Sequence, residues 1–147
     1  MDSPNPAIAT ILIIDGHDND RTYYVDRLKK ALPEWVILEA KDGKSGFALY
    51  QSRQIDCIIA EIQLPDMAGF QLLFAVVPLM SPPKVAFIFL ARAALPASVD
   101  FAGRHGAQAF LMKRLTNGDD LAKAVLTAIA AGPTYQEAKP FSDPSFN

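Results

Sequence analysis

Five short apolar runs alternate along the chain with amphipathic stretches. The runs cover Thr10–Ile14, Trp35–Ala40, Cys57–Glu61, Val85–Leu90 and Gln108–Met112. Continuous apolar runs of this length, bounded by polar turns, are typical of strands that are buried on both faces of a parallel sheet. Helical spacing and the placement of Pro and Gly predict the intervening helices, over Asp20–Leu32, Lys44–Ser52, Gly69–Val77, Pro96–Arg104 and Asp119–Ala131.

Five successive βα units predict one α/β domain with right-handed crossovers. The expected fold class is the flavodoxin-like (βα)5 doubly wound parallel sheet with strand order 2-1-3-4-5, in which the ligand crevice lies beyond the carboxyl ends of the strands. Asp15, Glu61, Ala91 and Lys113 all follow predicted strands. We therefore expect these four residues to line the crevice.

The domain is expected to span residues 9–131. Residues 1–8, which contain two prolines, are predicted to be a flexible leader. Residues 132–147 contain three prolines, Phe141 and Phe146 without any periodicity, and are predicted to be a disordered tail or the start of a linker.

The composition is that of a soluble globular protein, with half of the residues apolar, a fifth charged and a net charge of −2. This balance predicts no nucleic-acid or membrane surface. The longest apolar stretch, Val85–Leu95, is interrupted by Arg92 and is too short to span a bilayer. The single Cys57 is interpreted as a buried strand thiol rather than a redox switch or nucleophile, and a cytoplasmic location is expected.

Several short motifs occur in order between Ala9 and Ala131. They are Ile13-Ile14-Asp15, Glu39-Ala40-Lys41-Asp42-Gly43, Leu64-Pro65, Gly106-Ala107 and Lys113. This ordered set resembles the CheY-like receiver domain of two-component response regulators. In that family the position of Glu61 is an aspartate that accepts a phosphoryl group. A pair of acids after the first strand, and a backbone carbonyl two residues beyond the acceptor, hold magnesium there.

The chain departs from this family pattern at the metal site. The acid pair aligns with Asp15 and Gly16, so the second acid is lost. Mg²⁺ prefers octahedral oxygen coordination, so we expect its binding, through Asp15 and the Gln63 carbonyl, to be weak or absent. His17, Asp18 and Asp20 follow closely, and one of these acids could substitute. A turn and helix N-cap is the favoured interpretation of that segment.

The resemblance also implies a switch that is altered here. Ala91 stands at the position of its serine or threonine, and Phe110 at that of its aromatic partner. Lys113 is retained and, placed as in the family, would pair with Glu61. Two interpretations compete: Glu61 mimics the phosphorylated state, or Glu61 and Lys113 satisfy each other in a vestigial pocket. The missing hydroxyl at position 91 favours the second.

The resemblance implies docking through the fourth helix, fifth strand and fifth helix, here presenting Ala97, Asp100, Phe101, Arg104, Gln108, Lys123 and Thr127. The spacing favours Phe101 as a core residue over an exposed anchor. Arg92 and Arg114 flank the crevice, and solvated loop charge is favoured over an anion site.

The sequence therefore predicts a receiver-like signalling module of a two-component phosphorelay. It is expected to be a non-enzyme that is not phosphorylated at Glu61 and acts by protein–protein contact. Its partner would be a histidine kinase, an output domain or another regulator, and a homodimer stays open. One alternative is phosphorylation on an unconventional acid such as Asp15 or Asp66, and another is a small crevice enzyme using Asp15, Glu61 and Lys113. No helix-turn-helix for DNA binding occurs within the chain.

Overall fold

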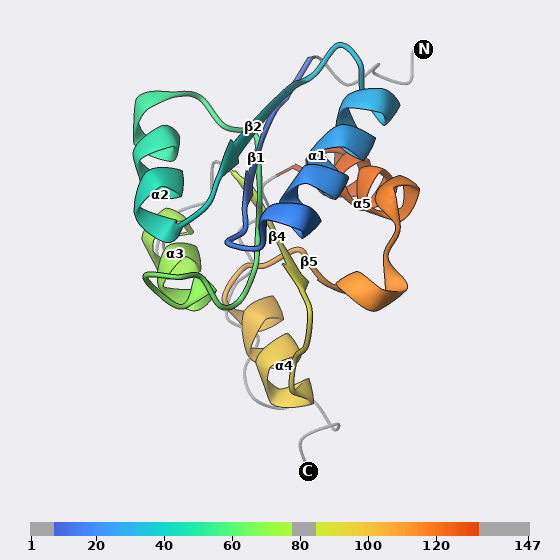
Figure 1. Ribbon diagram of the computed structural model, residues 1–147. Coiled ribbons are helices and arrows are strands. Elements are labelled where there is room, and N and C mark those ends of the chain that lie inside the picture. Colours follow the sequence, from blue (N-terminus) through green and yellow to red (C-terminus); the bar gives the residue numbers. More distant parts are fainter. Residues whose placement is uncertain (1–7, 78–84, 133–147) are drawn as a thin grey trace.

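The sheet is parallel throughout. The computed structural model describes residues 8–77 and 85–132, so most of the expected leader and tail lies outside the described residues. The strands are β1 (Thr10–Ile14), β2 (Val36–Ala40), β3 (Cys57–Ala60), β4 (Ala86–Ala91) and β5 (Ala109–Met112). They pair in the order β2-β1-β3-β4-β5 (Figure 1). The flavodoxin-like fold class and the strand order are confirmed.

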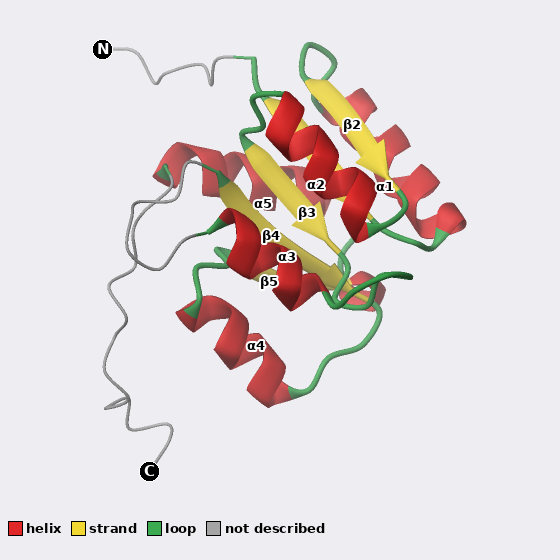
Figure 2. Cartoon of the chain, turned by 90° about the vertical axis from the view of Figure 1, so that its left-hand side faces the viewer, coloured by secondary structure: helices red, strands yellow, loops and turns green. Residues whose placement is uncertain are grey.

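Helices cover both faces of this sheet. They are α1 (Asp18–Ala31), α2 (Gly43–Ser52), α3 (Gly69–Val76), α4 (Pro96–Arg104) and α5 (Gly118–Ala131), with a 3-10 turn, η1 (Lys113–Leu115), that the sequence did not predict. Helices α2, α3 and α4 lie on one face, and α1 and α5 lie on the other (Figure 2). Within residues 8–77 and 85–132, no helix combines the length and apolarity needed to cross a bilayer.

Each face of the sheet has its own buried core. Leu12, Ile58 and Phe89 belong to the core beneath α2, α3 and α4. Their neighbours along the strands point the other way, into a core shared with α1 and α5. The three central strands are buried on both faces as expected, but β2 and β5 are partly exposed. The expectation is wrong for these two because each is an edge strand with one neighbour.

Cys57 lies in the core between β3 and the α1–α5 layer. Its side chain is fully buried and it makes no disulfide. Burial raises the pKa of the thiol, with a further small contribution from Asp56. The interpretation of Cys57 as a buried strand thiol is confirmed.

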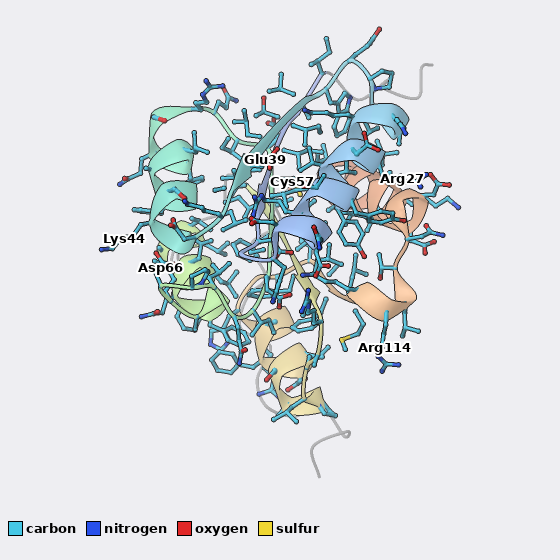
Figure 3. All side chains as sticks on the ribbon, viewed as in Figure 1. Arg27, Glu39, Lys44, Cys57, Asp66 and Arg114 are labelled. Carbon is cyan, nitrogen blue, oxygen red and sulfur yellow. The ribbon has the colours of Figure 1, made fainter. Side chains whose placement is uncertain are left out.

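The parallel arrangement decides which chain segments meet at each edge of the sheet. All five strands end at one edge, and the helices that follow them begin there and run back. At this edge Asp66 accepts hydrogen bonds from the backbone N–H groups of Gly43 (2.8 Å) and Lys44 (2.9 Å), in the first turn of α2 (Figure 3). The helix C-termini consequently lie at the opposite edge.

Candidate functional site

Three ionisable side chains converge where β1, β3 and β5 end. Lys113 Nζ lies 2.6 Å from Asp15 Oδ2 and 2.8 Å from Glu61 Oε2. The side chains are almost completely buried, with exposed fractions of 8 % for Lys113, 3 % for Asp15 and 4 % for Glu61. Parallel strands bring these residues to one edge although they are far apart in sequence. The structure thus places together the three ionisable residues among the four that the sequence assigned to the crevice.

A fourth charged residue, Asp20, enters the site from the first turn of α1. Its Oδ2 atom lies 2.8 Å from Lys113 Nζ and accepts a second hydrogen bond, also 2.8 Å, from Arg92 Nε. The interpretation of this segment as a turn and N-cap is wrong for Asp20. The N-cap is His17, which makes no side-chain capping bond. Asp20 points into the crevice because α1 begins at the edge where β1 ends.

The Glu61 carboxylate connects the ends of three strands. Its Oε1 atom accepts from the backbone N–H of Ile62 (2.8 Å), and its Oε2 atom accepts from the backbone N–H of Arg92 (3.2 Å) as well as from Lys113. Both carboxylate oxygens are therefore engaged. The residue after β3 is tied in this way to the loop after β4 and to the residue after β5.

Further contacts from α1 fix the backbone around the site. The Tyr24 hydroxyl donates to the backbone carbonyl of Thr116 (2.6 Å) and lies 3.3 Å from that of Lys113. Arg21 Nη1 donates to the backbone carbonyl of Asp15 (2.7 Å). Helix α1 thereby holds both the turn that carries the lysine and the end of β1.

Gly16, where the family has its second acid, faces Pro65 closely. A Cβ atom at Gly16 would lie 2.8 Å from both Cγ and Cδ of Pro65. Separations below about 3.0 Å require one of the atoms to move, and the proline ring has little freedom to do so. Any side chain at this position would have to displace Pro65, so the structure has no room here for the missing acid.

The charges of the cluster shift the pKa values of its members. Burial alone would lower the pKa of Lys113, but its hydrogen bonds to Asp15, Asp20 and Glu61 outweigh burial and raise it. The hydrogen bond from Arg92, opposed by partial burial and aided by Lys113, lowers the pKa of Asp20 to about 2. Lys113 is therefore an ammonium and Asp20 a carboxylate at neutral pH.

The site contains donor atoms of the kind that bind metals. Atoms of Asp15, His17 and Asp20 lie within 4.8 Å of one another. The Lys113 ammonium, however, contacts both of these carboxylates directly. A Mg²⁺ ion would have to compete with this fixed cation, and one of its three ligands would be an imidazole rather than the oxygen it prefers. The residues present fit a bound ammonium better than they fit Mg²⁺.

The two switch positions lack hydroxyl groups and are packed. Ala91 ends β4 and is fully buried. Phe110 on β5 is half-buried and packs against Phe89, with ring centroids 5.5 Å apart. Neither side chain can donate a hydrogen bond to Glu61, which takes the backbone N–H of Arg92 instead.

The two arginines that flank the crevice differ from each other. Arg92 is mostly exposed but is not simple solvated charge, because it bonds Asp20 and lies at the mouth of the site. Arg114 is exposed on η1 and points outward from the molecule (Figure 3). Solvated loop charge describes Arg114 and is wrong for Arg92.

The expected docking face contains one residue that the sequence misplaced. Phe101 is 42 % exposed, so its assignment to the core is wrong. Helical spacing put it on an apolar side of α4, but that side extends past the core to the surface beside α3. Of the other residues, Asp100 and Arg104 form an ion pair (2.8 Å), and Ala97, Lys123 and Thr127 are exposed.

The fold and the position of the acids define a class of protein, and comparison with known families agrees. The family model described as "Response regulator receiver domain" matches residues 11–126. The chain belongs to this family and is a receiver domain of a two-component response regulator. Proteins of this class are signalling modules that interact with kinases or output partners.

Individual relatives lie within the same class. The chain is 32% identical over 126 residues to the transcriptional regulatory protein UhpA of Escherichia coli strain K12, covering 86% of this chain and 61% of that protein. It is 28% identical over 134 residues to the nitrate/nitrite response regulator protein NarL of the same strain, covering 91% and 61%. The chain thus spans about three fifths of the length of these curated relatives.

Solved structures show the same fold. A CheY-like receiver domain protein from Methanospirillum hungatei JF-1 superposes with a TM-score of 0.76 at 23% identity, over 85% of this chain and 96% of that one. The receiver domain of the putative response regulator NarL from Mycobacterium tuberculosis gives 0.75 at 25% identity, over 85% and 98%.

Proposed function

We propose that this receiver domain signals by protein–protein contact without being phosphorylated at Glu61. The observation that carries the proposal is the Lys113 ammonium, which is enclosed by the carboxylates of Asp15, Asp20 and Glu61 at 2.6 to 2.8 Å. In such an arrangement a fixed ammonium of the chain itself, with Arg92 beside Asp20, already offsets most of the negative charge of the site.

Phosphoryl transfer places specific demands on a site that this one meets poorly. The transferring group needs an accessible acceptor oxygen and metal ions that neutralise charge on its own oxygens. Glu61 is buried and both of its oxygens accept hydrogen bonds. Gly16 supplies no second acid, and Pro65 closes the space beside it. We propose accordingly that Mg²⁺ binds weakly or not at all and that the domain needs no cofactor.

Glu61 instead supports a fixed arrangement of the loop after β4. The carboxylate holds the Arg92 backbone N–H, and Asp20 holds the Arg92 side chain. A phosphorylated side chain would bring a charge of about −1.5 to −2, against −1 for Glu61. Because the single charge of Glu61 is already sufficient to anchor Arg92, we propose that the loop is held in one state permanently. This favours a constitutive role for Glu61 over a purely vestigial one.

The alternative acceptors are also engaged. Asp15 is buried and accepts from the His17 backbone N–H (2.9 Å) in addition to Lys113. Both oxygens of Asp66 bind the first turn of α2. Neither carboxylate is free to attack a phosphoryl donor without losing a structural contact, which weighs against phosphorylation on an unconventional acid.

A crevice enzyme is disfavoured by the protonation state of its expected base. A lysine acts as a base or nucleophile only when it is neutral, but the three carboxylates raise the pKa of Lys113. We propose that the crevice performs no catalysis. Its partner would be a histidine kinase, an output domain or another regulator in the cytoplasm, and docking through α4, β5 and α5 stays a prediction, as does a homodimer.

The proposal is tested by intact-mass spectrometry after incubation with acetyl phosphate and Mg²⁺. A receiver with the usual aspartate serves as positive control. We expect the control to gain a phosphoryl group and this chain to gain none. An adduct that disappears in Glu61→Gln would overturn the proposal. An adduct that persists in Glu61→Gln and disappears in Asp15→Asn or Asp66→Asn would establish the unconventional-acid alternative.

A further inference from the structure

Four rings from α3, α4 and the residue after α4 form a cluster that we call the aromatic patch, made of Phe70, Phe74, Phe101 and His105. Phe101 packs on Phe70 (5.3 Å between centroids), Phe74 (5.9 Å) and His105 (4.1 Å). Phe70 anchors the patch to the core through Phe89, at 5.2 Å. The patch is therefore a preformed surface with a fixed geometry.

The outer members of the patch remain in solvent. Phe74 is 48 % exposed and Phe101 is 42 % exposed. Scattered apolar side chains are normal on a protein surface, but contiguous exposed ones mark a surface that another segment or molecule covers. The site described above does not use this surface.

The chain after α5 leaves the domain close to the aromatic patch. Helices α3, α4 and α5 all run back from the crevice edge, so their C-termini meet at the opposite edge of the sheet. Phe74 and Phe101 lie in the later parts of α3 and α4, and His105 follows α4. Gln108 Nε2 donates to the backbone carbonyl of Gly132 (3.0 Å), which fixes the exit of the chain next to the start of β5.

A short series of contacts connects this exit to α4. The residue before Gln108 is Ala107, whose backbone N–H donates to the carbonyl of Ala102 on α4 (3.0 Å). His105 is three residues from Gln108, a separation of at most about 11 Å along an extended chain. The exit at Gly132 is thus within roughly 20 Å of the patch, allowing for the length of the Gln108 side chain.

The segment after Gly132 is long enough to cover that distance. Phe141 is the ninth residue after Gly132, so nine residues, 133–141, make up this reach. They span at most about 30 Å when extended and about 16 Å as a flexible chain. Phe146, five residues further on, has a longer reach. Either phenylalanine can contact the patch without any change in the domain.

The composition of the segment suits this surface. Phe141 and Phe146 are its apolar anchors, and both follow closely after prolines, at positions 140 and 144. Proline cannot continue a helix and favours extended backbone, which leaves such anchors to dock one by one rather than as a helix face. Aromatic rings pair favourably in edge-to-face contacts of the kind that already build the patch.

We propose that residues 133–147 dock on the aromatic patch of the same chain, with Phe141 and Phe146 as the anchors. The docked segment covers Phe74 and Phe101, and a partner that uses this surface has to displace it. The proposal is independent of whether the crevice accepts a phosphoryl group. It assigns to the segment a regulatory contact with α3 and α4.

The test is paramagnetic broadening from a nitroxide attached at Ser142→Cys in the complete chain. Cys57 is fully buried, so the reagent reaches only the introduced thiol. We expect the amide signals of Phe74, Phe101 and His105 to be lost. Broadening confined to residues around Gln108 and Gly132 would overturn the proposal, because it would mean that the segment stays near its exit without docking.

Three controls separate the origins of the broadening. The added pair Phe141→Ser and Phe146→Ser leaves the domain intact and is expected to restore the signals; persistent broadening would contradict the role of these anchors. Leu115→Ser removes an exposed apolar residue elsewhere and should leave the broadening unchanged. Mixing isotope-labelled chain that lacks the nitroxide with spin-labelled chain identifies docking on a second copy. Broadening only in that mixture would overturn docking within one chain.

Discussion

Replacing Lys113 by Met tests the balance of charge in the crevice. The substitution keeps an unbranched side chain of similar length and removes the ammonium from Asp15, Asp20 and Glu61. Asp20 is partly exposed and retains its bond to Arg92. Asp15 and Glu61, with side-chain exposures of 3 % and 4 %, would keep buried negative charges without a cation.

The expected cost follows from that burial. Removing one partner of a buried ion pair costs about 3–5 kcal/mol, because the remaining charge is left uncompensated. We expect Lys113→Met to lower the free energy of unfolding by that amount at pH 7. Adding Glu61→Gln removes one of the uncompensated charges. The loss of unfolding free energy in the double variant should therefore be about 1–3 kcal/mol smaller than the sum of the losses in the two single variants.

Urea denaturation followed by the fluorescence of the single Trp35 provides the assay, since this side chain packs against the core on the α1 side. Lys30→Met is a matched control: Lys30 pairs with Asp26 on the surface, with both side chains more than half exposed, and should change stability by less than about 0.5 kcal/mol. A loss of unfolding free energy below about 1 kcal/mol for Lys113→Met would refute the reasoning. It would mean that the buried carboxylates do not depend on the Lys113 ammonium to compensate their charge.

The stability cost of Lys113→Met should depend on pH in the alkaline range. The folded-state pKa of Lys113 is raised above its ordinary value of 10.5. Its stabilising contribution is therefore complete below pH 10.5 and is lost as the pH rises through the folded-state value. The stability difference between the original chain and Lys113→Met should stay constant from neutral pH to about 10 and shrink above that. A difference that already vanishes near pH 8 would contradict this sign.

Three further outcomes are expected. Asp20→Asn should lower the free energy of unfolding by about 1 kcal/mol at pH 7, after allowance for solvent screening. Because the folded-state carboxyl pKa is lowered to about 2, this difference should fade as the pH falls from 4 to 2, which denaturation at several pH values measures. Gly16→Ala should lower the free energy of unfolding by about 1–3 kcal/mol, because the new Cβ meets Pro65, whereas an unchanged value would show that Pro65 moves freely. Cys57 should react with a thiol reagent only after unfolding, because burial both shields it and raises its pKa. If Cys57 in the folded protein reacted as fast as an exposed thiol, this would argue against the fold.

Local sequence signals predicted the bounds of helices well where residues such as Pro and Gly mark the helix ends. The bounds of Pro96–Arg104 agree with α4 because Pro96 suits a first helical turn and Gly106 follows the end with a positive φ of 103°. Helix α1 begins two residues earlier than expected, at Asp18. Its N-cap is His17, which makes no side-chain capping bond and is not a residue type that marks a helix start.

The site was harder to predict beyond the ends of strands. Asp15, Glu61 and Lys113 follow directly from strand ends, because the sheet order places them at one edge. Asp20 belongs to a helix, and the direction of its side chain depends on the orientation of α1 relative to β1. The spacing of residues alone does not determine that orientation. Phe101 was misplaced for a related reason: periodicity shows which side of a helix is apolar but not where the neighbouring helix stops covering it.

The central claim is that the crevice is closed by Lys113 and Glu61 and does not respond to a phosphoryl donor. The most direct measurement compares backbone amide spectra of the complete chain before and after addition of acetyl phosphate and Mg²⁺. We expect the signals of Ile62 and Arg92, whose N–H groups bind Glu61, to stay in place. A shift of these signals, accompanied by changes along the loop into α4, would contradict a permanently held state.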